Sequence, residues 1–115
     1  MSLDVTLYID VDTGGEGLTR VELFSANITH NLGKMAVEAG IYNHLWHHEE
    51  VGAKHAGDII DALDAGLTLM KADPDHFEQF NASNGWGLYE HFVPWVKRYL
   101  EACREHPKAI IGVWR

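Results

Sequence analysis

Apolar and polar side chains alternate strictly along the N-terminal segment of this chain. Every second position from Leu3 to Val11 is Leu, Val or Ile, and the positions between them hold Asp, Thr or Tyr. A period of two matches the pleat of a β-strand, whose successive side chains point to opposite faces. The segment is therefore predicted to be a strand with one buried face. The rest of the chain must then supply a neighbouring strand and a layer that covers this face.

The neighbouring strand is predicted directly after a turn. Residues 12–17 are rich in glycine, which adopts the positive φ angles of tight turns without steric cost. Residues 18–26 then return to the strand pattern, with Val21 on one predicted face and Glu22 and Phe24 on the other. The two segments together predict a β-hairpin.

Apolar residues recur at helical spacing through the rest of the chain. The predicted helices cover residues 31–39, 41–48, 53–70, 74–80 and 88–105. Gly40 suits the left-handed position that follows a helix, and Asp73 with Pro74 forms a signal for a helix start. Residues 109–114 are apolar and predict a final strand.

This order of elements predicts an α+β fold. The N-terminal hairpin and the C-terminal strand are expected to form a small, mostly antiparallel sheet, with four to five helices packed on one face. A length of 115 residues is typical of one domain, so we predict a single domain over residues 1–115.

The charge balance limits the partners that this chain can bind. It has 9 Lys and Arg residues against 17 Asp and Glu, and a formal net charge of −8. A surface that binds phosphates needs clustered Lys and Arg, so a nucleic-acid partner is not expected. An acidic decoy that occupies a basic nucleic-acid-binding site stays open as an alternative.

The single cysteine and the lack of long apolar runs suggest a location. Cys103 has no second cysteine to pair with, which fits a reducing cytoplasm, and it falls on the apolar side of a predicted helix. We therefore expect a buried thiol in a cytoplasmic protein. No apolar stretch is long enough to cross a bilayer, so no membrane partner is expected.

Histidines are concentrated in the middle of the chain and raise the question of a metal site. His44 and His48 are one helical turn apart. His30 lies earlier in the chain, in the segment Asn27-Ile28-Thr29-His30-Asn31. Imidazoles at this spacing can share a divalent metal ion, which would activate a water molecule in a hydrolase. No established metal motif is present, so the alternatives are solvent-facing imidazoles or a His30 that hydrogen-bonds to the backbone.

A loop with the sequence Asn84-Gly85-Trp86-Gly87 is a second candidate site. In one interpretation, Trp86 stacks on a ligand or partner while Asn84 forms hydrogen bonds to it. In the other, the glycines let the chain turn, Trp86 fills the core and Asn84 caps the next helix. The structural interpretation is the commoner role for such a loop, and Asn84 and Trp86 are the candidate contact residues. Glu90 and His91 follow nearby, but neighbours on a helix point about 100° apart, so we do not expect them to share a site.

Several motifs together resemble a known family. They are Asn27-Ile28-Thr29-His30-Asn31-Leu32, Met35-Ala36, Glu38-Ala39-Gly40-Ile41 and Asn84-Gly85-Trp86-Gly87 with Tyr89-Glu90. This pattern is similar to a family of small proteins of bacteria and their phages for which no activity is established. The resemblance covers the chain from about residue 5 onward. It implies a small cytoplasmic accessory protein and assigns no catalytic residue.

Two functional hypotheses of different classes follow. The first is a non-enzymatic accessory or binding domain that binds a protein partner or itself, with its tryptophans shared between core and interface. These tryptophans are Trp46, Trp86, Trp95 and Trp114. The second is a metal-dependent enzyme of the hydrolase type that uses His30, His44 and His48.

Overall fold

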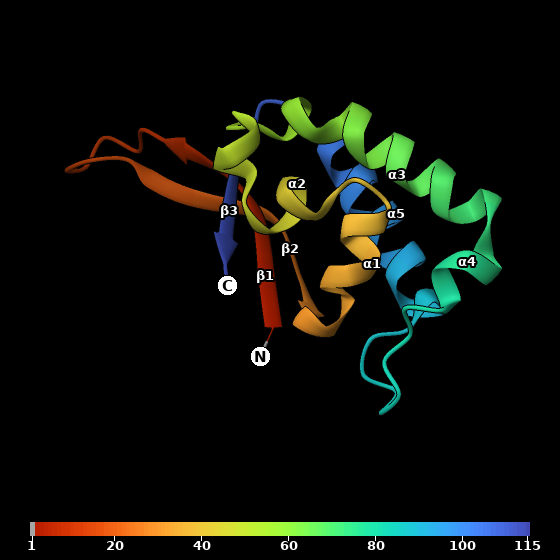
Figure 1. The fold of residues 1–115 in the computed structure, drawn as a ribbon. Helices are drawn as coiled ribbons and strands as arrows, with labels where there is room; N and C mark the ends of the chain where they lie inside the picture. The colour runs from red at the N-terminus through yellow and green to blue at the C-terminus, as the bar shows by residue number, and fades with distance from the viewer. Residues whose placement is uncertain (1) are drawn as a thin grey trace.

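The strands form one antiparallel sheet with the N-terminal strand in its centre (Figure 1). The computed structural model describes residues 2–115. Strand β1 (Ser2–Val11) pairs with β2 (Thr19–Thr29) on one side and with β3 (Ile110–Trp114) on the other. The order β2-β1-β3 confirms the predicted α+β fold, in which a hairpin and the terminal strand share a sheet.

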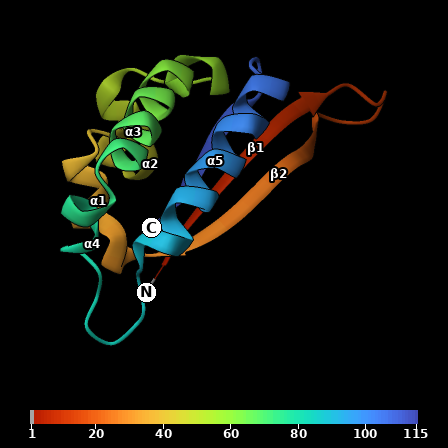
Figure 2. The same cartoon turned by 90° about the vertical axis from the view of Figure 1, so that its right-hand side faces the viewer.

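The helices lie between β2 and β3 in the chain and gather on one face of the sheet (Figure 2). They are the 3-10 helices η1 (His30–Leu32), η2 (His48–Val51) and η3 (Ala56–Ile59), and the α-helices α1 (Gly33–Glu38), α2 (Tyr42–Trp46), α3 (Ile60–Ala72), α4 (Pro74–Glu78) and α5 (Tyr89–Glu105). Within residues 2–115, no helix has both the length and the apolar character that a membrane crossing requires.

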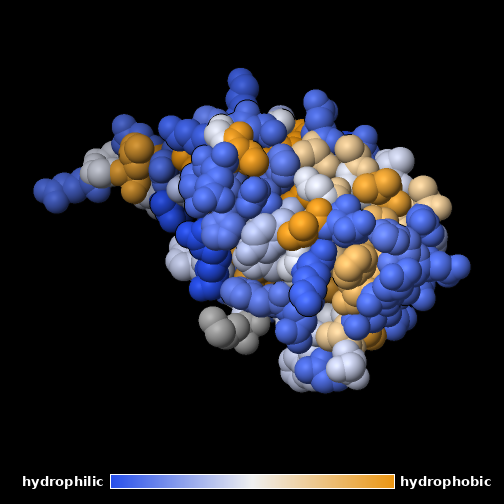
Figure 3. All heavy atoms as spheres, in the orientation of Figure 1, coloured by the Kyte–Doolittle hydropathy of each residue, from blue (hydrophilic) through white to orange (hydrophobic). Residues whose placement is uncertain are grey.

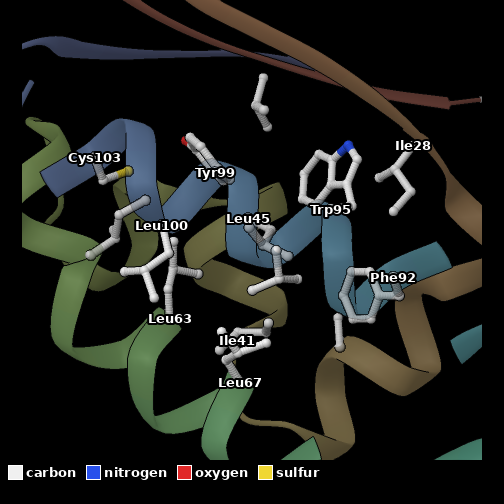
Figure 4. Packing of buried hydrophobic residues seen from close by; sticks show 14 of the residues in the cluster. Ile28, Ile41, Leu45, Leu63, Leu67, Phe92, Trp95, Tyr99, Leu100 and Cys103 are labelled. Carbon is white, nitrogen blue, oxygen red and sulfur yellow. The ribbon is translucent and has the colours of Figure 1, made fainter. Parts of the chain in front are cut away.

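The core forms where the apolar side of β1 meets the helices. Leu3, Val5 and Leu7 are fully buried, as the alternation predicts, and α5 packs against both β2 and α3. The apolar stripe of α5 includes Trp95 and Tyr99, which lie beside residues of the other helices in Figure 4. The buried apolar side chains form one continuous cluster. Each fully buried aliphatic side chain in such a cluster contributes about 1.5–3 kcal/mol of transfer free energy.

The pairing of β1 with β2 contains an irregularity that the sequence pattern did not predict. The register shifts between Leu7 and Tyr8, which pair with Phe24 and Glu22, so that Leu23 is an extra residue in β2. An extra residue reverses the alternation of faces in the bulged strand. Phe24 therefore lies on the helical side, where its ring stacks on Tyr99 at 5.8 Å. The prediction that Phe24 shares a face with Glu22 was wrong for this reason.

Helix boundaries follow the local capping signals. The Asp73 side chain accepts a hydrogen bond from the His76 backbone N–H at 3.4 Å, and Gly40 has a φ of +78°, so both predicted signals are confirmed. The predicted helix over residues 53–70 was too long at its start. Its first turn is the 3-10 helix η3, because the Asp58 carboxylate accepts hydrogen bonds from the Lys54 and His55 backbone N–H groups.

One end of the hairpin extends beyond the helices (Figure 1). We call residues 9–23 the hairpin arm. Leu18 and Val21, which lie in the arm, are among the exposed large hydrophobic side chains. The arm's polar side carries Arg20, whose guanidinium lies 3.7 Å from the centre of the Tyr8 ring and 3.9 Å from the Asp10 carboxylate. The hairpin is thus covered at one end and bare at the other.

Candidate functional site: the Trp86 cleft

The candidate site is an open cleft at the end of the sheet opposite the arm. The end of β2 and η1, residues 27–32, form one wall, and the loop of residues 84–87 forms the other. Ser2 and His91 complete the lining. The cleft has a volume of about 990 Å³. We call it the Trp86 cleft.

Trp86 stands in this cleft with its backbone held at both ends. Its N–H donates to the Oδ1 atom of Asn84 at 2.9 Å, and its carbonyl accepts from the Nδ2 atom of Asn31 at 2.7 Å. The side chain itself is 71% exposed. The interpretation in which Trp86 fills the core was therefore wrong. The ring is presented to solvent by a loop whose position is set by hydrogen bonds.

The two glycines are what allow this loop conformation. Gly85 has a φ of +78° and Gly87 a φ of +122°, values that residues with a Cβ rarely adopt. Gly87 is also buried against η1, where an added Cβ would lie 3.0 Å from the Cβ of Asn31. The next helix, α5, is capped differently from the prediction: Asn81 Oδ1, and not Asn84, accepts from the Tyr89 N–H at 2.7 Å.

The opposite wall is built from polar residues with defined partners. Asn27 donates from Nδ2 to the Asp4 carboxylate at 2.8 Å and to the Ser2 hydroxyl at 2.9 Å. Thr29 caps η1 by accepting from the Asn31 N–H at 3.2 Å. His30 lies edge-on to Trp46, with ring centres 6.0 Å apart, and its Nε2 atom is buried without a hydrogen-bond partner among residues 2–115.

The candidate metal ligands have separate surroundings. His30 lines the Trp86 cleft, whereas His48 lies in η2, where its Nδ1 atom hydrogen-bonds to the Ala53 carbonyl at 2.7 Å. His44 is half-buried in α2, and burial lowers the pKa of its imidazole. In the part of the chain that the structure describes, no group of three or more His, Cys, Asp or Glu side chains could hold a metal ion. The structure therefore does not bring His30, His44 and His48 together as a metal site.

Other histidines are engaged in contacts within the chain. His76 pairs with the Glu38 carboxylate at 2.8 Å, and His47 contacts the Arg115 guanidinium. Arg115 also donates to the Trp46 carbonyl at 3.2 Å. These contacts join segments that are distant in sequence, and because the side chains are partly exposed each contributes at most about 1 kcal/mol.

The single thiol is not poised for chemistry. Cys103 is fully buried in α5, as predicted, and burial raises the pKa of its thiol to about 12. Since the thiolate is the nucleophilic form, Cys103 is inert at neutral pH. Burial also raises the pKa of the neighbouring Tyr99 hydroxyl.

Sequence reasoning found part of the cleft and missed part of it. Asn84 and Trp86 are in its lining, as the loop motif predicted. His91 was set aside because it does not share a helix face with Glu90, yet it lines the cleft without Glu90. Of the four tryptophans, Trp46 and Trp95 are buried in the core, whereas Trp86 and Trp114 are exposed; that the exposed pair forms an interface stays a prediction.

Comparisons with family models, curated proteins and solved structures find no match to this chain. The family resemblance described above therefore stays a prediction.

Proposed function

We propose that this chain is a non-enzymatic accessory domain of the cytoplasm that works as a homodimer, joined through the hairpin arm. The observation that supports this most directly is the order Arg20-Val21-Glu22 on the outer edge of β2, with which no strand pairs among residues 2–115. An edge with opposite charges on either side of a valine can pair with a copy of itself.

The outer side of β2 is free along the arm. Among the described residues, no strand pairs with this side of β2. Near the C-terminal end of β2, one backbone group already has a partner, because the Trp95 indole N–H donates to the Asn27 carbonyl at 3.1 Å. Strands that stay unpaired in monomers are often protected by Lys, Pro or a β-bulge; β2 contains no Lys or Pro, and its bulge lies at Leu23, at the base of the arm. Along residues 19–22, before the bulge, the edge is therefore open to pairing with another strand.

A second copy of β2 fits this edge with matched charges. If two copies pair antiparallel with Val21 opposite Val21, then Arg20 of each copy lies opposite Glu22 of the other. The arrangement has two-fold symmetry, as most homodimers do. Opposite charges directly across an antiparallel pair stabilise it by roughly 0.2–1 kcal/mol each. Because the two Arg20–Glu22 pairs form together, no Arg lies opposite Arg and no Glu lies opposite Glu in this register.

Apolar contacts support the same register. Val21 is 38% exposed and Leu18 is 65% exposed, and Figure 3 shows apolar atoms on the projecting arm. In this register, Leu18 of one copy lies opposite position 24 of the other, so each arm tip reaches the base of the other arm. At that base an apolar hollow of about 280 Å³ is lined in part by Ile9, Leu23 and Pro107. Burial of the exposed Val21 and Leu18 side chains in such a pair favours the dimer.

The non-enzymatic part of the proposal rests on how the reactive side chains are used. The Cys103 thiol is buried with a raised pKa, and the His48 and His76 imidazoles are hydrogen-bonded within the fold. The thiol is thus removed from solvent, and one nitrogen of each of these two imidazoles is already engaged within the fold.

A charge-swap series tests the dimer by solution mass, measured by sedimentation over a wide concentration range. The wild-type chain of 12.9 kDa is expected to approach twice this mass as concentration rises. Arg20→Glu puts two acidic side chains opposite each other and is expected to give a monomer. The double variant Arg20→Glu/Glu22→Arg restores both ion pairs and is expected to recover the dimer. Glu16→Arg, at an exposed turn position outside this register, is the matched control and should behave as wild type.

Two outcomes would reject the proposal. One is a wild-type monomer at every concentration. The other is a dimer that Arg20→Glu leaves intact, which would assign self-association to a different surface. Because Arg20 also contacts Asp10 and Tyr8 within the chain, the unfolding midpoint of each variant is measured alongside its mass.

A further inference from the structure

Among residues 2–115, the lining of the Trp86 cleft contains no formally charged side chain. The chain has 26 charged residues (9 + 17), yet no Asp, Glu, Lys or Arg is among the residues that line this cleft. Its polar groups are hydroxyls, amides and imidazoles. A phosphate or carboxylate ligand would find no Lys or Arg side chain among the described lining residues, and nucleic-acid sites rely on such charges. The cleft is therefore suited to a neutral ligand.

Three asparagines of the cleft are each held at one end of the amide. Asn27 and Asn31 donate from Nδ2, to Asp4 and to the Trp86 carbonyl, and Asn84 accepts through Oδ1 from the Trp86 N–H. These partners determine which amide atom is which, because a carboxylate or carbonyl only accepts and a backbone N–H only donates.

The other end of each amide is free. The Oδ1 atoms of Asn27 and Asn31 and the Nδ2 atom of Asn84 make no hydrogen bond to any residue in the range 2–115. The lining residues of the cleft thus carry two acceptors and one donor whose amides are oriented by bonds within the fold. Hydroxyl groups match such a mixed set, since each can donate one hydrogen bond and accept two.

Trp86 adds a flat apolar surface beside these amides. Its ring is 71% exposed, and the loop that carries it is held by both backbone hydrogen bonds and by two glycines with positive φ. A ligand that uses all of these groups must have one flat apolar face and polar groups around its edge. A pyranose ring has this form, with axial C–H bonds on one face and hydroxyls at its rim.

An extended peptide fits less well. A peptide that adds to a sheet bonds to free backbone groups along the edge strand. Beside the cleft, the outward carbonyl of Asn27 is already bonded to the Trp95 indole at 3.1 Å. The edge that a peptide strand would extend is therefore occupied at this point.

We propose that the Trp86 cleft is a binding site for a neutral saccharide, with the C–H face of one pyranose ring stacked on Trp86 and its hydroxyls bonded to the asparagine amides. The site lies at the opposite end of the sheet from the arm, so it is independent of the proposed dimer.

Titration of isotope-labelled protein with neutral oligosaccharides, followed by NMR, tests this site. The probes are neutral oligomers of glucose, galactose, mannose and N-acetylglucosamine, together with an uncharged peptide of similar length. At least one saccharide is expected to shift the Trp86 indole resonance and the side-chain amide resonances of Asn31 and Asn84. Trp86→Ala is expected to weaken this binding about tenfold or more, and Trp86→Tyr, which keeps an aromatic face, to weaken it less.

Trp114→Ala is the matched control, because Trp114 is also an exposed tryptophan, at 53%, but lies outside the cleft lining. It should bind like wild type. The proposal is overturned if no saccharide shifts the cleft resonances, if Trp86→Ala binds as well as wild type, or if only the peptide shifts them. His91→Ala provides a second cleft variant that leaves the loop hydrogen bonds intact and is expected to alter the same resonance shifts.

Discussion

The two ends of the β1–β2 hairpin carry the same kind of side chain in different surroundings. Val5, at one end, is fully buried under the helices, whereas Val21, on the arm, is 38% exposed. Both valines belong to strands with apolar and polar residues in alternation. The difference arises because the helices cover only part of the sheet's length (Figure 1). Valines of equal hydrophobicity are thus buried in the core at one end and exposed to solvent at the other.

Truncation of each valine to alanine tests whether burial makes Val5 contribute more to stability than Val21. Val5→Ala removes two methyl groups from a filled core and is expected to lower the free energy of unfolding by about 2–3 kcal/mol. Val21→Ala is expected to cost less than about 1 kcal/mol in the monomer. Urea denaturation at low protein concentration gives both values. Similar losses for the two variants would show that the arm is covered in the monomer too.

Two glycines, one in the packed helical layer and one in the exposed hairpin turn, test the same difference in packing between the two regions. An alanine Cβ at Gly66 in α3 would lie 2.5 Å from Ile41 Cγ2 and 3.1 Å from the Ala39 carbonyl. The clash is expected to outweigh the better helix propensity of alanine, so that Gly66→Ala destabilises by about 1–2 kcal/mol. Gly15 in the hairpin turn has no atom within 4 Å of such a Cβ, so Gly15→Ala should change stability by less than about 0.5 kcal/mol. Thermal melting curves compare the two, and a stabilised Gly66→Ala would contradict this packing.

The smallest expected effect is on the pH dependence of stability, and it is tested at the half-buried His44 and the exposed His91. Burial lowers the pKa of His44 in the folded chain below the ordinary value of about 6.5, so the unfolded chain binds a proton more readily. The stability of the wild-type chain should therefore fall as pH decreases through about 6.5 and below. His44→Gln should lessen this fall, whereas His91→Gln, at the exposed cleft rim, should retain it. Urea midpoints between pH 8 and pH 5.5 measure the slopes, and parallel slopes for wild type and His44→Gln would remove His44 as the cause.

The strands and the presence of most helices could be predicted from the sequence, because alternation and helical spacing are local properties, but several helix ends differ, as at α2 and α3. Alternation predicts a strand whatever it packs against, and Asp73 with Pro74 starts a helix through backbone groups within one turn. Burial of Cys103 also followed from its place on an apolar helix stripe. In each case the cause lies within a few residues of the effect.

Tertiary structure decided the features that depend on distant residues. The extra residue at Leu23 is a property of how β2 pairs with β1, and it moved Phe24 onto Tyr99. Similarly, the exposure of Trp86 depends on Asn31, which is 55 positions away in the chain and holds the loop from η1. Helical spacing related His44 to His48, but α2 ends at Trp46 and His48 lies in the separate helix η2. The final position and exposure of a side chain depend on contacts with residues distant in the sequence, and a local sequence pattern does not specify those contacts.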